Sequence, residues 1–103
     1  MILPQLSAVL LGTSVVVTVA DEMPKLDVMP SCRAASSVPP ANLQSCLKDE
    51  ENARALLAGR WTQFAAGDRA TCSRQNSIGG LSSYVVLLTC LETARDARKL
   101  PKN

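Results

Sequence analysis

Apolar residues recur every three or four positions along two stretches of the chain, which is the spacing of one face of an α-helix. The first stretch predicts a long helix over residues 42–66, and the second predicts a helix that starts near residue 83 and ends near residue 100. The apolar stripe of the first is Leu43, Cys46, Leu47, Ala53, Leu57, Trp61 and Phe64, and that of the second is Tyr84, Leu87, Leu88 and Leu91.

A short helix over residues 68–74 is expected between the two long ones. Gly67 suits the position that follows a helix C-terminus, and the Asp68 carboxylate can cap the helix that comes next. The last helix is expected to begin at Ser82 or Ser83, because either hydroxyl can accept a free backbone N–H of its first turn.

Residues 84–88 alone, Y-V-V-L-L, are also typical of a buried β-strand. The segment that follows, E-T-A-R-D-A-R-K, consists largely of strong helix formers and continues the same apolar period. A helix is therefore the preferred prediction. Val85 and Val86 widen its apolar face beyond what a contact with one other helix requires. If these valines are exposed they favour a protein partner, whereas full burial would leave the charged faces as candidate surfaces.

Glu50 interrupts the stripe of the first long helix. It either marks the edge of the buried face or has a buried partner. Its spacing from Arg54 predicts an i,i+4 ion pair on the same helix.

Residues 1–20 contain no charged side chain, and the apolar run at 6–19 has the length of the hydrophobic part of a signal peptide. Thr18 and Ala20 are the small residues expected before a cut after position 20. The sequence therefore predicts a cleaved signal peptide at 1–20 and a periplasmic or secreted protein. The segment lacks an N-terminal Lys or Arg, so a retained anchor, a buried strand or a wrongly assigned start are the alternatives.

Four prolines, at positions 24, 30, 39 and 40, fall in the segment that follows. This segment, 21–41, is predicted to be an extended arm without regular structure of its own. The helical domain then spans 42–100.

The charge balance of the chain excludes a strongly basic protein. Eleven Lys and Arg face nine Asp and Glu, all beyond residue 20, for a formal charge of +2. Nucleic-acid binding calls for a clustered and much more basic surface, so no nucleic-acid partner is expected. A domain this small is usually marginally stable unless disulfides or a metal support it.

Four cysteines can supply that support, and an even number in a short exported chain is typical of two disulfides. The C-x-x-C spacing of redox pairs and zinc knuckles is absent from the sequence. Structural disulfides are therefore predicted, with no metal and no cofactor. Reactive thiols and a four-cysteine metal site are the alternatives.

Helix length constrains which cysteines pair. Cys46 and Gly67 are 21 residues apart, about 31 Å along a straight helix, whereas a disulfide needs Cα atoms within about 7 Å. Cys72 lies beyond that far end, so a Cys46–Cys72 bond is excluded unless the long helix breaks. If the last helix returns antiparallel to the first, Cys90 reaches the level of Cys46, which favours Cys46–Cys90 with Cys32–Cys72. The sequential pairing, Cys32–Cys46 with Cys72–Cys90, is the alternative.

Candidate catalytic groups are scarce. Histidine is absent, which removes the commonest general base, and the glycine pair at 79–80 lacks the lysine and spacing of a phosphate-binding loop. We predict no catalytic residue, and we expect the three aromatic residues to belong to the core. The tail is basic through Arg95, Arg98, Lys99 and Lys102, which suits a helix C-terminus or, as a sharper hypothesis, contact with a polyanion or an anionic membrane.

Several segments together resemble a group of small exported proteobacterial proteins with four cysteines. They are C-R-A-A at 32–35, S-C-L-K-D-E-E-N-A-R-A-L-L at 45–57, W-T-Q-F at 61–64, D-R-A-T-C at 68–72 and S-Y-V-V-L-L-T-C-L-E-T-A-R-D-A at 83–97. The resemblance implies export and structural cysteines, and it transfers no catalytic or binding residues. It leads us to expect a glutamate at position 86, where this chain has valine.

The sequence therefore predicts a small all-α domain in which two main antiparallel helices, with a short one between them, are held by two disulfides. Its predicted role is that of a non-enzymatic exported module that contacts another protein or an envelope assembly. Polyanion or membrane-surface binding through the basic tail is one alternative, and a thiol-redox or metal-buffering role is another.

Overall fold

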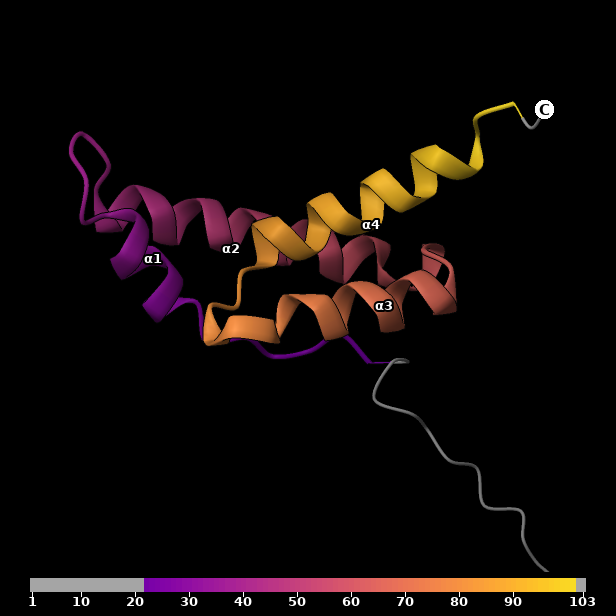
Figure 1. The fold of residues 1–103 in the computed structure, drawn as a ribbon, viewed down its shortest axis with the longest axis horizontal. Helices are drawn as coiled ribbons and strands as arrows, with labels where there is room; N and C mark the ends of the chain where they lie inside the picture. The colour runs from indigo at the N-terminus through magenta and orange to yellow at the C-terminus, as the bar shows by residue number, and fades with distance from the viewer. Residues whose placement is uncertain (1–21, 102–103) are drawn as a thin grey trace, which may run out of the picture.

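The computed structural model describes residues 22–101, so the predicted signal peptide at 1–20 lies outside the described part of the chain. Within that part the structure is helical and contains no strand, which confirms the all-α prediction (Figure 1). Its elements are α1 (Met29–Ala35), α2 (Leu43–Arg60), the 3-10 turn η2 (Trp61–Gln63), α3 (Ala66–Asn76), the 3-10 turn η3 (Ile78–Gly80) and α4 (Tyr84–Arg98). No helix of residues 22–101 is long and apolar enough to span a bilayer.

The three longer helices alternate in direction, so α2 and α4 run the same way (Figure 1). Near the start of α4 the backbone N–H of Tyr84 contacts Glu50, and further along Glu92 pairs with Arg60. The prediction that the two long helices are antiparallel is wrong. α3, 11 residues long, itself returns along α2, and the chain reverses once more before α4 begins.

α2 ends six residues earlier than predicted, at Arg60. A 3-10 turn follows, and Phe64 then adopts an extended backbone conformation at φ −81° and ψ 149°. Because this single turn keeps Trp61 and Phe64 on the core side, the apolar period passes through the break and conceals it. Gly67 consequently lies inside α3, and Asp68 stands in the first turn of α3 without capping it.

The segment predicted to be an extended arm, 21–41, contains the helix α1, so that prediction is wrong for Met29–Ala35. Pro30 lies at the start of α1, where its missing N–H costs nothing. Residues 23–28 have no regular structure, as predicted, but their apolar side chains Met23, Leu26 and Val28 pack against the core.

The core is formed by α2, α3 and α4 together with η2. The second predicted stripe supplies it, and so does the first from Ala53 onward, whereas Leu43, Cys46 and Leu47 are half-buried outside the cluster. This confirms the helical interpretation of residues 84–88 and the core placement of all three aromatic residues. Leu57, Leu87 and Leu91 are completely buried. The other buried apolar members of this cluster are Ala53, Trp61, Phe64, Cys72, Tyr84 and Leu88.

Side-chain caps start two of the helices. The Asn42 side chain accepts the N–H of Ser45 at the start of α2, and the Ser83 hydroxyl accepts the N–H of Val86 at the start of α4. Of the two predicted serine caps, Ser83 is therefore the one used. The turn before it contains Gly79 with φ 88° and Gly80 with φ 75°. Both values lie in the left-handed region, which favours glycine.

Candidate functional site

All four cysteines form disulfides, and they pair sequentially. Cys32 is bonded to Cys46 with Cα atoms 5.5 Å apart, and Cys72 is bonded to Cys90 with Cα atoms 5.8 Å apart. The favoured pairing of Cys46 with Cys90 and Cys32 with Cys72 is wrong, and the alternative pairing is present. The first bond joins α1 to the start of α2, and the second joins α3 to α4.

The direction of α4 explains the error. α4 begins beside Glu50 and runs parallel to α2, away from Cys46. Cys90, in the second turn of α4, is therefore farther from Cys46 than the start of α4 is. α4 is antiparallel to α3, which brings Cys90 beside Cys72 (Figure 1). The predicted absence of a Cys46–Cys72 bond is confirmed, since both cysteines are bonded to other partners.

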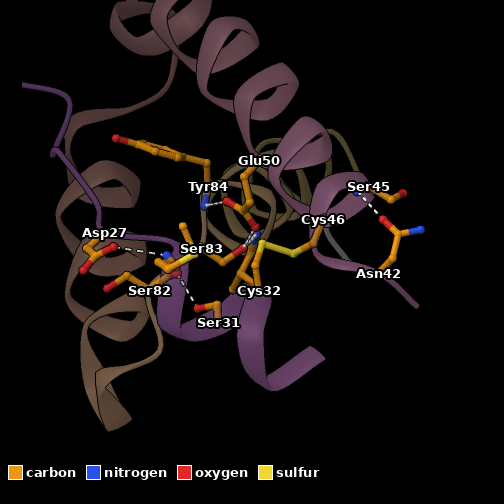
Figure 2. The surroundings of a disulfide bond; sticks show 12 residues. Asp27, Ser31, Cys32, Asn42, Ser45, Cys46, Glu50, Ser82, Ser83 and Tyr84 are labelled. Carbon is orange, nitrogen blue, oxygen red and sulfur yellow. Dashed lines mark hydrogen bonds between the residues drawn. A yellow bond between two sulfur atoms is a disulfide. The ribbon is translucent and has the colours of Figure 1, made fainter. Parts of the chain in front are cut away.

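A buried carboxylate lies beside the Cys32–Cys46 disulfide (Figure 2). Glu50 is 5% exposed, and its two oxygens accept the Ser83 hydroxyl at 2.5 Å and the Tyr84 backbone N–H at 2.6 Å. Both donors belong to the start of α4, whose N-terminal partial positive charge favours an anion. Of the two interpretations of Glu50, the edge of the buried face or a buried partner, the second is present.

Further hydrogen bonds surround this contact. The Ser83 hydroxyl accepts the N–H of Val86 at 3.1 Å while it donates to Glu50, and the Ser83 N–H donates to the Asn76 side chain at 3.4 Å. The serine hydroxyl and both carboxylate oxygens therefore join α2 to α4, and the Ser83 backbone N–H adds the link to α3. This arrangement positions helices and leaves the Ser83 hydroxyl buried.

The predicted Glu50–Arg54 pair is absent because Glu50 points inward. Arg54 pairs instead with Glu51 through its Nε and Nη2 atoms. This hydrogen bond lowers the pKa of the Glu51 carboxyl below its ordinary value. The sequence signal for burial of the other glutamate was that Glu50 alone among these acidic residues interrupts the apolar stripe.

The N-terminal segment is attached to the same region by two hydrogen bonds. The Tyr84 hydroxyl accepts the N–H of Leu26 at 2.9 Å. The Ser31 hydroxyl donates to the Ser82 carbonyl at 2.5 Å (Figure 2). These bonds join residues more than 50 positions apart in the chain. The segment before α2 is therefore part of the folded domain.

Exposed aliphatic side chains mark one surface of the domain. Val85 and Val86 of α4 are 39% and 55% exposed, and Leu56 of α2 is 45% exposed. Leu56 lies one turn before Arg60, and Val85 lies two turns before Glu92. Since Arg60 and Glu92 pair across the two helices, Leu56 and Val85 flank one seam between them. Val86 follows Val85 on the solvent side of α4. We call these three exposed residues, Leu56, Val85 and Val86, the outer seam.

The predicted basic tail is largely engaged within the fold. Arg98 donates to both oxygens of Asp68 at 2.8 and 3.0 Å, and Arg95 lies over the Phe64 ring. The hydrogen bonds from Arg98 lower the pKa of the Asp68 carboxyl. Lys99 is exposed, and Lys102 lies outside the described residues. Within residues 22–101, the cations of this tail do not form one free basic strip.

Two observations bear on the hypotheses of a reactive thiol and of a metal site. Every cysteine is disulfide-bonded, so the chain has no free thiol. Within residues 22–101 no three acidic or cysteine side chains gather in a way that could hold a metal ion.

Comparison of the chain with protein-family models, with characterised proteins and with solved structures finds no match.

Proposed function

We propose that the protein is exported and acts in the periplasm or outside the cell as a non-enzymatic module that binds another protein. Two disulfides in 103 residues are typical of proteins in an oxidising compartment. The apolar, uncharged residues 1–20 supply the export signal in this proposal. Membership of the group of small exported four-cysteine proteins belongs to the same proposal.

The exposure of Val85 and Val86 carries the protein-binding part of the proposal. Both residues lie on a well-formed helix whose opposite face is buried, so neither is needed for the core. Leu56 of α2 is a third exposed aliphatic side chain. The Glu50 contact and the Arg60–Glu92 pair join α2 to α4 directly, so the surface meets a partner at low entropic cost.

The size of the outer seam indicates what kind of partner it receives. A stable interface covers about 800 Å² on each side, and obligate homodimers have larger and more apolar interfaces. Three partly exposed aliphatic side chains cover only a fraction of that area. The polar residues around them, including the Arg60–Glu92 pair, must supply the rest. This composition favours a different protein with a mixed apolar and polar surface over a second copy of this chain.

The test places a photo-crosslinking amino acid at position 86 in the exported protein and identifies what is captured in the source cell. The captured protein is then purified, and its affinity is measured for Val86→Asp and Leu56→Asp variants. Val38→Asp is the matched control, because Val38 is 68% exposed in the loop between α1 and α2. We expect at least a tenfold loss of affinity for the two seam variants and an unchanged affinity for the control.

Two results would overturn this proposal. Equal affinity in all three variants would remove the outer seam from the interface. Crosslinks from position 86 to the chain itself, with a concentration-dependent dimer in sedimentation, would replace a different partner by a second copy.

Export is tested separately by N-terminal sequencing of the protein recovered from the periplasm or medium. A mature chain beginning at Asp21 is expected. An intact N-terminus on protein found only in the cytoplasm would contradict export while leaving the binding surface to be judged by the crosslinking experiment.

A further inference from the structure

Two arginine side chains lie over aromatic rings at the end of the domain where the chain passes from α2 through η2 into α3. The Cζ atom of Arg69 is 5.7 Å from the centre of the Trp61 ring, and that of Arg95 is 5.5 Å from the centre of the Phe64 ring. The rings are three residues apart and both are buried. We call these four residues the arginine end.

The two arginines come from different helices but stand at the same level. α3 and α4 are antiparallel and are joined at Cys72 and Cys90, whose Cα atoms are 5.8 Å apart (Figure 1). Arg69 precedes Cys72 by three residues and Arg95 follows Cys90 by five. At about 1.5 Å per residue these offsets are about 4.5 and about 7.5 Å in the same direction. Both guanidinium groups therefore lie toward one end of the α3–α4 pair.

This end of the fold collects hydrogen-bond donors that have no acceptor. The Nε atoms of Arg69 and Arg95 and the indole Nε1 of Trp61 are buried and make no hydrogen bond. Most buried polar groups in proteins have a partner, so three such donors around one pair of rings require an explanation. All three are N–H groups, and the group that would satisfy such a site is an acceptor.

Nearby arginines show the contrast. Arg60 and Arg98 each hold a carboxylate, on Glu92 and Asp68 respectively. Arg69 makes no ion pair with a residue of the described part of the chain. Arg95 makes one long ion pair, with 3.7 Å between its Nε atom and the Asp96 carboxylate, and no hydrogen bond. The half-buried guanidinium groups of Arg69 and Arg95 thus retain donors that the fold does not use.

The backbone adds favourable charge at the same place. α3 begins at Ala66 without a side-chain cap, and its first backbone hydrogen bond runs from the Arg69 N–H to the Ala65 carbonyl. A helix N-terminus of this kind attracts anions. Asp68 already stands in this turn, but two hydrogen bonds from Arg98 neutralise its carboxylate.

We propose that the arginine end is an anion site that binds a phosphate group through the guanidinium groups of Arg69 and Arg95. A guanidinium fork matches two oxygens of a phosphate, and a tetrahedral phosphate offers oxygens to two forks at once. The aromatic rings hold both forks in place before the ligand arrives, which reduces the entropy lost on binding. This site is separate from the outer seam and does not depend on the proposed protein partner.

The experiment uses the protein purified after export and inorganic pyrophosphate as the probe. Trp61 is the only tryptophan of the chain, so its fluorescence reports directly on the ring beneath Arg69. Titrations are run at constant ionic strength with chloride as the reference salt. Arg69→Gln and Arg95→Gln are the test variants, and Arg74→Gln is the control because Arg74 is an exposed arginine of the same helix.

We expect a saturable fluorescence change with pyrophosphate that is at least tenfold weaker in both test variants and unchanged in Arg74→Gln. Calorimetry gives the same affinities independently of the tryptophan. Arg69→Lys and Arg95→Lys keep the charge without the fork, and they replace the glutamine variants if circular dichroism shows these to be unfolded. An intermediate loss is expected for the lysine variants.

Three results would contradict the proposal of a phosphate site. The first is a change that follows ionic strength alone, and the second is equal binding by the Arg74→Gln and test variants. The third is tighter binding of citrate than of pyrophosphate, which would assign the donors to carboxylates.

Phosphatidylglycerol and phosphatidylcholine vesicles then distinguish the source of the phosphate group. Binding to anionic vesicles that requires Arg69 and Arg95 and is displaced by pyrophosphate assigns the site to a lipid headgroup. Pyrophosphate binding without vesicle binding assigns it to a soluble phosphate compound.

Discussion

The Glu50 carboxylate in the middle of α2 accepts the backbone N–H of Tyr84, the first residue of α4, at 2.6 Å. The two residues are 34 positions apart in the chain. Through this contact a side chain of one helix caps the N-terminus of another, and it sets the point on α2 at which α4 begins.

Replacing Glu50 with Gln should destabilise the domain by about 1–3 kcal/mol, because a buried acceptor becomes in part a donor that faces other donors. Urea denaturation followed by circular dichroism measures the change. Glu51→Gln is the matched control on the same helix. Since Glu51 is exposed and pairs only with Arg54, its replacement should leave the denaturation midpoint nearly unchanged. Similar losses in both variants would contradict the capping role of Glu50.

Peptide mapping under non-reducing conditions should show the sequential disulfides. Trypsin releases the four cysteines in separate peptides, 26–33, 34–48, 70–74 and 75–95. The expected linked pairs are 26–33 with 34–48 and 70–74 with 75–95. A linked pair of 34–48 with 75–95 would instead require α4 to run antiparallel to α2, in contradiction to the contacts of Glu50 and Arg60.

Truncation of two adjacent leucines of α2 should cost very different amounts of unfolding free energy. Leu57 is completely buried, so Leu57→Ala is expected to cost about 2–5 kcal/mol of unfolding free energy. Leu56 is 45% exposed, and Leu56→Ala should change stability by less, at most about 0.5 kcal/mol. Thermal and urea unfolding compare the two variants. Equal costs would mean that the outer seam is covered by part of the same chain.

Replacing Tyr84 with Phe removes the hydroxyl that accepts the Leu26 N–H. We expect faster hydrogen exchange at the Leu26 amide and a loss of about 1 kcal/mol in global stability. The exchange rate in the core of α4, at Leu88 for example, serves as the internal reference. Unchanged exchange at Leu26 would show that the hydroxyl does not hold the N-terminal segment.

The Asp68–Arg98 pair should give the domain a small acid sensitivity. Its hydrogen bonds lower the pKa of Asp68 in the folded state, so the unfolded chain binds more protons at acidic pH. The stabilisation is complete above the ordinary carboxyl pKa and is lost as the pH falls through the lowered value. Because Arg98 is exposed, salt reduces the effect.

Carboxyl NMR titration of the Arg98→Gln variant checks this assignment. The pKa of Asp68 should rise toward its ordinary value, while that of Glu51, which is lowered by Arg54, should stay the same. An unaltered Asp68 titration would show that Arg98 is not the cause of the lowered pKa.

Much of the local structure follows from the sequence because it depends on contacts between near neighbours. The stripes on α2 and α4, the Ser83 cap and the helical state of residues 84–88 are all set by spacing and by side chains within one or two turns. Glu50 was recognisable as an interruption of the stripe, but the sequence did not decide between an edge position and a buried partner.

The break after Arg60 illustrates why helix ends are harder to predict. One 3-10 turn shifts Trp61 and Phe64 so little that the apolar period continues across it. α1 was missed for a related reason, since a short helix with proline near its start has too few turns to show a period.

The sequence by itself determined an all-α domain, its two apolar stripes and the presence of two disulfides, because composition and short-range spacing are enough to specify them. Only the tertiary structure decided the direction of α4, the pairing of the cysteines and the meeting of Arg69 with Arg95 at one end. These depend on how the chain reverses between α2 and α4. A few residues in the turns determine that reversal, and its consequences appear only when helices distant in the sequence pack together.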